Sequence, residues 1–229
     1  MRKLFLLLLC CCLIPFPAHA AENEKLVCLT FDDGPSGRFT RRLLEGLATY
    51  DVKATFFLCG YRLEQYPTLA QRICDEGHEI GLHGFSHDSM KTMCRRTLTQ
   101  ELQKTLSLLP QDCNVAFVRP PGGSGGGCTE RVAKELGLSI LYWSVDPKDW
   151  AVHDAATIEK AILRRVQDGD IILLHDMSDS SVDAALNLIP KLQKQGFRFV
   201  TASELAQAKG ITPLAGNAYF RFDADDAPK

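Results

Sequence analysis

The chain has 229 residues, of which 45% are hydrophobic and 24% charged, and its formal net charge at pH 7 is −2. This composition excludes a disordered, collagen-like or coiled-coil chain and provides enough apolar residues for a globular core. The near-neutral charge excludes the strongly basic surface of typical nucleic-acid-binding proteins, so no nucleic-acid partner is expected.

The first twenty residues have the pattern of a secretory signal peptide. Arg2 and Lys3 precede an apolar run over residues 4–17, and residues 18–20 (AHA) match a small-residue cleavage site. The run ends before the roughly 20 apolar residues of a membrane span, so no transmembrane anchor is expected. A lipid anchor at residues 10–12 is not favoured, because no lipobox precedes these cysteines. The sequence therefore predicts a secreted or cell-envelope protein.

The nine cysteines are unusual in this composition. Three of them would leave with the signal peptide, and six would remain: Cys28, Cys59, Cys74, Cys94, Cys113 and Cys128. An even number of cysteines in an exported chain favours disulfides. A metal site made of cysteines is not favoured, because these six include no C-x-x-C pair. Cys28 and Cys59 lie in apolar runs and are expected to be buried thiols. The one pairing that we predict is Cys113 with Cys128.

Predicted strands and helices alternate along the chain. Seven short apolar, β-branched or aromatic runs are the strands: residues 25–31, 54–60, 79–83, 115–119, 139–146, 170–175 and 197–201. Between them, apolar residues three and four positions apart predict helices. Thr157 and Ser203 stand at expected helix N-caps, and Gly137, Gly169 and Gly196 at expected helix ends. Such alternation implies parallel pairing, so we expect one barrel-like α/β domain over residues 21–210. A C-terminal tail follows at residues 211–229, with three aspartates facing solvent.

Polar residues gather after these strands, where the loops of a parallel barrel converge. They are Asp32, Asp33, His83, His87, Arg119, Asp149, Trp150 and His175. A helical turn would bring His83 and His87 to one face, and Asp33 can complete a two-histidine, one-carboxylate set that leaves positions open for water and substrate. Zn²⁺ fits these ligands best, and Co²⁺, Ni²⁺, Mn²⁺ and Fe²⁺ are alternatives. The competing interpretations are a hydrogen-bonded turn without metal and a pair of turn-capping carboxylates.

Five segments follow one another at the ends of five predicted strands: residues 30–35 (TFDDGP), 83–87 (HGFSH), 119–123 (RPPGG), 146–150 (DPKDW) and 173–175 (LLH). Together they resemble the ordered motifs of the polysaccharide deacetylases, carbohydrate esterase family 4. The resemblance covers nearly all of the chain after residue 20. It implies a distorted (β/α) barrel of about seven parallel strands and metal-dependent removal of N-acetyl groups from sugar polymers.

The resemblance also implies a role for each site residue. The implied metal ligands are Asp33, His83 and His87. The implied catalytic residues are Asp32 as general base, His175 as general acid, Arg119 orienting Asp32, and Asp149 holding His175. The implied substrate-binding residues are Gly122, which would donate a backbone N–H to the oxyanion, and Trp150 and Leu173, which would line the pocket for the acetyl methyl group. On residue type alone, Trp150 and Leu173 are more often core residues than pocket residues, and the alternative for Arg119 is an exposed charge at a strand end.

Two positions depart from the family pattern. Gly84 replaces the usual Ser or Thr after the first metal histidine and lacks the hydroxyl that could brace the loop. Gly122 replaces an aromatic residue and begins a glycine-rich stretch whose backbone is very free. We expect the predicted disulfide to restrain this stretch, because Cys113 and Cys128 flank it.

Three polar residues are expected to lie outside the chemistry. Asp146 is expected to cap a turn, His78 to make a structural hydrogen bond at the opposite end of the barrel, and His153 to lie on the surface. The sequence thus predicts a monomeric, secreted, metal-dependent deacetylase that acts on N-acetylglucosamine units of peptidoglycan. Alternatives are a chitooligosaccharide or xylan deacetylase and, in another class, a non-catalytic carbohydrate-binding envelope domain.

Overall fold

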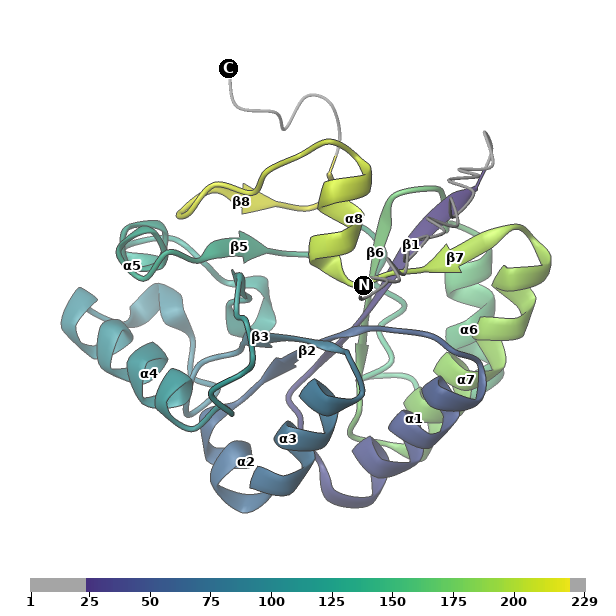
Figure 1. Ribbon diagram of the computed structural model, residues 1–229, viewed down its shortest axis with the longest axis horizontal. Coiled ribbons are helices and arrows are strands. Elements are labelled where there is room, and N and C mark those ends of the chain that lie inside the picture. The colour runs from purple at the N-terminus through teal and green to yellow at the C-terminus, as the bar shows by residue number, and fades with distance from the viewer. Residues whose placement is uncertain (1–23, 223–229) are drawn as a thin grey trace, which may run out of the picture.

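The structure is a computed structural model that describes residues 24–222 (Figure 1). The expected signal peptide and the three aspartates of the tail lie outside the described residues. All seven predicted strands are present, with an eighth short one: β1 (Lys25–Asp32), β2 (Thr55–Leu58), β3 (Glu79–Leu82), β4 (Phe117–Val118), β5 (Ser139–Leu141), β6 (Asp170–His175), β7 (Phe197–Phe199) and β8 (Ala218–Tyr219). Within this range, no helix has both the length and the apolar character needed to span a membrane.

The strands form one parallel sheet in the order β6-β1-β2-β3-β4-β5-β8, and β7 pairs with the start of β1. The predicted strand over residues 139–146 is shorter, since β5 ends at Leu141. Further along the same segment, Val145 forms a parallel β-bridge with Ile172 of β6. This bridge brings the segment after β5 next to the strand at the other edge of the sheet. The expected single-domain, distorted barrel is confirmed.

The helices surround this sheet and supply the outer half of the core. They are α1 (Gly37–Thr49), α2 (Gly60–Gln65), α3 (Pro67–Asp75), α4 (Arg95–Ser107), α5 (Thr129–Glu135), α6 (Ala155–Leu163), α7 (Asp179–Lys194) and α8 (Ala202–Ala208). Helices α1, α6 and α7 pack beside one another over β1 and β6 (Figure 1). Strand β1 is buried along nearly its whole length, which explains its unbroken apolar sequence.

Two predicted helix caps are wrong. The side chain of Asp154 accepts from Thr157 N (2.8 Å), so Thr157 lies inside the first turn of α6. Thr201 likewise caps α8 in a reciprocal pair with Glu204, and Ser203 lies within that turn. In both helices the cap is the earlier residue, because a cap must accept from a backbone N–H two or three positions ahead.

Gly137 and Gly196 follow the C-caps of α5 and α7 and have positive φ, as expected. The prediction for Gly169 is wrong, because α6 ends at Leu163 and Gly169 lies in the turn directly before β6. Part of the expected C-terminal tail packs on the barrel. Strand β8 pairs with β5, and Ile211, Tyr219 and Phe222 are buried beside the core residues of β1 and β4.

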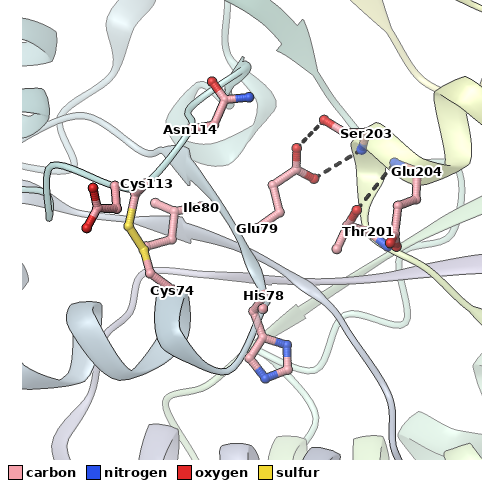
Figure 2. A pocket seen from close by; sticks show the side chains of 11 residues that line it. Cys74, His78, Glu79, Ile80, Cys113, Asn114, Thr201, Ser203 and Glu204 are labelled. Atoms are coloured by element: carbon pink, nitrogen blue, oxygen red, sulfur yellow. Dashed lines mark hydrogen bonds between the residues drawn. A yellow bond between two sulfur atoms is a disulfide. The ribbon is translucent and has the colours of Figure 1, made fainter. Parts of the chain in front are cut away.

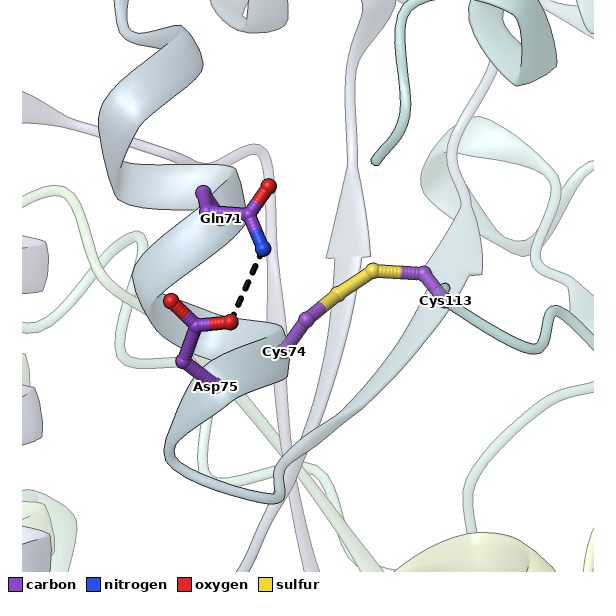
Figure 3. The surroundings of a disulfide bond; sticks show 4 residues. All are labelled: Gln71, Cys74, Asp75 and Cys113. Atoms are coloured by element: carbon purple, nitrogen blue, oxygen red, sulfur yellow. Dashed lines mark hydrogen bonds between the residues drawn. A yellow bond between two sulfur atoms is a disulfide. The ribbon is translucent and has the colours of Figure 1, made fainter. Parts of the chain in front are cut away.

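The predicted Cys113–Cys128 disulfide is wrong. Cys113 bonds to Cys74 at the end of α3 (Figure 3). Both of these cysteines precede a strand and so lie at the amino ends of the strands. Cys128 follows β4 and therefore lies towards the carboxyl ends, at the opposite end of the barrel from Cys113. Cys28 and Cys59 are fully buried free thiols, as expected.

A cavity of about 250 Å³ lies at the amino ends of the strands, beside this disulfide (Figure 2). Its buried carboxylate, Glu79, accepts hydrogen bonds from Ser203 N (3.1 Å), from the Ser203 hydroxyl and from Thr55 Oγ1 (2.9 Å). These bonds fasten the start of α8 to β3. The groups that line this cavity therefore join β2, β3 and the start of α8.

The Cys74–Cys113 bond should contribute measurably to stability, because it closes a loop with a sequence separation of 39 residues. We expect the double variant Cys74→Ser, Cys113→Ser to lower the free energy of unfolding by about 3 to 4 kcal/mol in urea denaturation. Adding a reductant should remove the difference between wild type and variant. Equal stabilities under oxidising conditions would contradict this expectation.

Candidate active site

The carboxyl ends of the strands surround a cavity of about 320 Å³. Its lining residues are Asp32, Asp33, His83, His87, Gly122, Trp143, Asp146, Trp150, Leu173 and His175. All but two of the site residues predicted from the sequence line this cavity. The other two, Arg119 and Asp149, are buried behind it and contact lining residues directly. The barrel topology thus brings the whole predicted set together.

Asp33, His83 and His87 form a group that could hold a metal ion. Asp33 Oδ1 lies 3.3 Å from His83 Nε2 and 3.0 Å from His87 Nε2. The expected helical turn between the histidines is absent. Gly84 and His87 have φ of 81° and 68°, and this irregular loop directs both imidazoles to the same point, with ring centroids 5.1 Å apart.

A hydrogen bond orients the His83 imidazole. His83 Nδ1 lies 2.7 Å from the Arg119 carbonyl oxygen, which can only accept, so Nδ1 is the donor of this bond. Nε2 is then the ring nitrogen that faces Asp33. Burial raises the pKa of the Asp33 carboxyl, but the hydrogen bonds and charges of His83 and His87 outweigh this effect and hold the pKa well below its usual range. One carboxylate and two imidazole nitrogens directed to one point are a ligand set that fits a divalent ion such as Zn²⁺.

Glu101 on α4 braces the loop that carries the two histidines. Its Oε2 accepts from Phe85 N (3.0 Å), Ser86 N (2.9 Å) and Ser86 Oγ (3.0 Å). The Glu101 carboxylate of α4 thus supports the loop in place of the hydroxyl that Gly84 lacks. Glycine suits position 84, because its φ lies in the left-handed region.

The Arg119 side chain is completely buried and all of its nitrogens are engaged. Nη1 donates to Asp32 Oδ1 (2.7 Å) and Thr30 Oγ1 (2.7 Å), while Nε and Nη2 donate to the carbonyl oxygens of Leu141 and Tyr142. Asp32 Oδ2 is left on the cavity side, 3.7 Å from His83 Nε2. Arg119 therefore fixes which oxygen of Asp32 faces the candidate metal site.

Asp149 holds His175 through two hydrogen bonds. Its Oδ1 lies 2.8 Å from His175 Nδ1, and its Oδ2 accepts from His175 N at 2.8 Å. Burial disfavours the charged imidazole, but the bond to Asp149 and its charge, together with the charges of Asp32 and Asp33, raise the pKa of His175 to about 9. His175 is thus held as a proton donor at neutral pH, with Nε2 available to a ligand.

Comparison with known proteins identifies the family of this chain. A family model described as "Polysaccharide deacetylase" matches residues 19–141. The chain belongs to the polysaccharide deacetylase family. It is 36% identical over 194 residues to a peptidoglycan-N-acetylglucosamine deacetylase of Bacillus cereus, covering 82% of this chain and 91% of that protein.

Two further family members are named for other substrates, and one of them is much longer than this chain. The peptidoglycan-N-acetylmuramic acid deacetylase PdaC of Bacillus subtilis is 34% identical, with 86% of this chain and 42% of that protein covered. A family 4 acetyl xylan esterase from Clostridium thermocellum, solved in complex with a cobalt ion, superposes with a TM-score of 0.80. It is 31% identical, with 86% of this chain and 98% of that one covered.

Trp143 is a cavity residue that the sequence did not single out, because it lies within a predicted strand. Its ring packs against the glycine-rich stretch, and a Cβ at Gly123 would lie 2.9 Å from a ring carbon. Leu173 is buried, whereas the indole of Trp150 is 62% exposed at the cavity. The cavity wall is therefore aromatic, although the stretch after Arg119 contains no aromatic side chain.

Asp176 was also missed. Its carboxylate is fully buried next to the turn at Gly34, and it accepts a hydrogen bond from the hydroxyl of Thr40. The Ser36 hydroxyl donates to its backbone oxygen. Burial raises the pKa of Asp176 to about 6. Its proximity to His175 in the sequence was the available signal, and its contacts show that it supports the turn that carries Asp33.

Asp146, His78 and His153 make the local contacts or have the exposure expected for them. Asp146 Oδ1 accepts from Lys148 N (2.7 Å) and caps a turn, although it also reaches the cavity. His78 Nδ1 accepts from Ala54 N (3.2 Å), and His153 is exposed.

Removing the Arg119 charge should leave the buried Asp32 carboxylate without its ion-pair partner. We expect Arg119→Met to lower the free energy of unfolding by about 3 to 5 kcal/mol in urea denaturation, and Asp32→Leu in the same chain to recover part of this loss. The matched control is Arg38→Met, which removes an exposed ion pair with Asp179 and should cost less than about 1 kcal/mol. Equal losses for Arg119→Met and Arg38→Met would contradict the expectation.

Proposed function

We propose that this protein is an extracytoplasmic, metal-dependent deacetylase that hydrolyses the N-acetyl groups of N-acetylglucosamine units in peptidoglycan and releases acetate. The observation that carries the proposal is one cavity surrounded by three prepared groups. These are the Arg119–Asp32 pair, the Asp149–His175 pair and the cluster of Asp33, His83 and His87. Acyl transfer from an amide needs a proton acceptor, a proton donor and an electrophile, and these groups provide each of them.

Asp33, His83 and His87 would hold the metal, for which we propose Zn²⁺. A bound divalent cation lowers the pKa of water and polarises a carbonyl. Asp32 Oδ2, on the cavity side, would accept a proton from the attacking water. Arg119 keeps the other oxygen of Asp32 occupied, so the carboxylate cannot rotate away from this position.

His175 would donate its proton to the nitrogen of the departing sugar amine. Asp149 occupies Nδ1, so the transferable proton is on Nε2. The acetyl group would enter the cavity between Trp150 and Leu173, and the Gly122 N–H would donate to the carbonyl oxygen as its negative charge grows.

The choice of substrate rests on the Bacillus cereus relative, which matches along nearly its whole length and is named for peptidoglycan N-acetylglucosamine. The acetyl xylan esterase and PdaC carry related sites for other acetylated sugars. The deciding experiment measures acetate release from acetylated peptidoglycan, chitooligosaccharides and acetylated xylan, with and without a chelator and with Zn²⁺ restored. We expect chelator-sensitive acetate, fastest from peptidoglycan, with free amines on glucosamine rather than on muramic acid. If no substrate yields metal-dependent acetate, the proposed activity is wrong, and the alternative of a non-catalytic carbohydrate-binding domain remains.

The two neighbouring aspartates should separate metal binding from turnover. Asp32→Asn should retain Zn²⁺ affinity in calorimetry and lower kcat by about 10² to 10⁴-fold, because the proton acceptor is lost. Asp33→Asn should weaken Zn²⁺ binding itself, because it replaces a charged ligand. An Asp32→Asn protein with a kcat near that of wild type would remove Asp32 from its proposed role.

The pH profile should report the Asp149–His175 pair. A general acid must be protonated, so kcat/KM falls as the pH rises through its pKa. Asp149→Asn removes the charge that raises the pKa of His175, so the alkaline limb should move to lower pH by about one unit or more. The matched control, Asp154→Asn, changes an exposed carboxylate that caps α6 and should leave the profile in place. An unmoved alkaline limb in Asp149→Asn would show that His175 does not set it.

A further inference from the structure

Two thiols outside the proposed catalytic groups lie on neighbouring segments, just before α4 and just before α5. Among the residues that the structure describes, the free cysteines are Cys28, Cys59, Cys94 and Cys128. Cys28 and Cys59 are sealed in the barrel core. Cys94 is exposed and Cys128 is partly exposed, so an oxidant can reach this second pair.

The backbone of one cysteine already contacts the sulfur of the other. The Cys128 thiol donates to the Met93 carbonyl oxygen, with Sγ and oxygen 3.2 Å apart. Met93 and Cys94 share that peptide group, so the Cys128 sulfur touches the backbone unit from which the Cys94 side chain emerges. Cys94 Sγ lies 3.2 Å from Thr97 Oγ1, and rotation about χ1 of this exposed side chain is the movement that redirects it.

Packing holds the two segments together. Met93 and Cys128 both pack against the core cluster beneath α4 and α5. Arg95 Nε lies 3.1 Å from the Glu135 carboxylate and joins the start of α4 to the end of α5. A Cβ at Gly127 would lie 3.4 Å from the Lys91 carbonyl oxygen, so the backbones are also close. The proximity of the cysteines is therefore a fixed property of the fold.

We propose that Cys94 and Cys128 form a second disulfide bond. The Cys94 thiolate attacks the disulfide of an oxidant, such as glutathione disulfide, and releases one thiol. The Cys128 thiolate then attacks the Cys94 sulfur of the mixed disulfide and releases the second thiol. Two electrons reduce the oxidant's disulfide, and the two protons that the cysteines lose end on the two released thiols. The hydrogen bond with Thr97 lowers the pKa of Cys94, in keeping with its part as the attacking group.

This bond would join two loops that carry proposed site residues. Cys94 ends the segment that follows β3 and contains His87, and Cys128 ends the glycine-rich stretch that contains Gly122. The bond would therefore limit the motion of that stretch, which is the role that the sequence analysis gave to a different pairing. It would also account for the six cysteines after residue 20 as two disulfides and two buried thiols.

The test is residue-specific thiol mapping of the full chain after incubation with glutathione disulfide. Free thiols are alkylated in denaturant, and the protein is cut with trypsin and chymotrypsin. Chymotrypsin is needed because Arg119 precedes proline and trypsin alone leaves Cys113 and Cys128 in one peptide. We expect a cross-linked Cys94–Cys128 peptide pair, lighter than the two reduced peptides by two hydrogens, with Cys28 and Cys59 alkylated.

Two single variants provide the controls. Cys94→Ser should give no cross-linked peptide, and Cys128→Ser should leave Cys94 as its mixed disulfide with glutathione, because the resolving thiol is absent. Recovery of alkylated Cys94 and Cys128 at the same yield as Cys28 and Cys59, in wild-type protein whose Cys74–Cys113 bond is intact, would overturn the proposal. The mapping measures sulfur chemistry alone, so its outcome does not depend on the proposed deacetylase activity.

Discussion

The buried guanidinium of Arg119 is the interaction on which the site depends. It bonds to side chains of β1 and to two carbonyl oxygens at the end of β5, and its ring-face contact with Phe57 of β2 places the charge 3.9 Å from that ring centroid. Its own carbonyl oxygen orients His83. One residue at the end of β4 therefore links four strands and sets the direction of both a carboxylate and an imidazole.

The same principle extends to the other polar groups around the cavity. Burying a charge is costly unless it is paired and hydrogen-bonded, and here Asp32 and His175 each have one atom in a hydrogen bond on the far side from the cavity and another atom facing it. Asp149 does this for His175, and Arg119 does it for Asp32. The supporting bonds lie on strands or strand ends, so the geometry is set by the barrel before any ligand arrives.

The sequence predicted the barrel and the gathering of the site well, because strand ends in a parallel barrel must converge. It failed where the outcome depends on which end of a strand a residue occupies or on local backbone angles. Cys113 and Cys128 are near in sequence, yet β4 separates them, while Cys74 is distant in sequence and adjacent in space. Trp143 and Asp176 gave no motif signal of their own, since their parts in the site arise from tertiary contacts with a glycine stretch and a turn.

Asp32 and Asp33 follow each other at the end of β1, where consecutive side chains would normally point to opposite faces. The left-handed backbone at Asp33, with φ of 72°, is what turns the second carboxylate towards the same cavity. Apart from glycine, asparagine and aspartate tolerate this conformation best, whereas β-branched side chains resist it. Position 33 is therefore constrained by backbone shape and, in the proposed metal site, by ligand chemistry as well. Few substitutions at position 33 would keep this backbone conformation, and asparagine is the one that changes the side chain least while removing its charge.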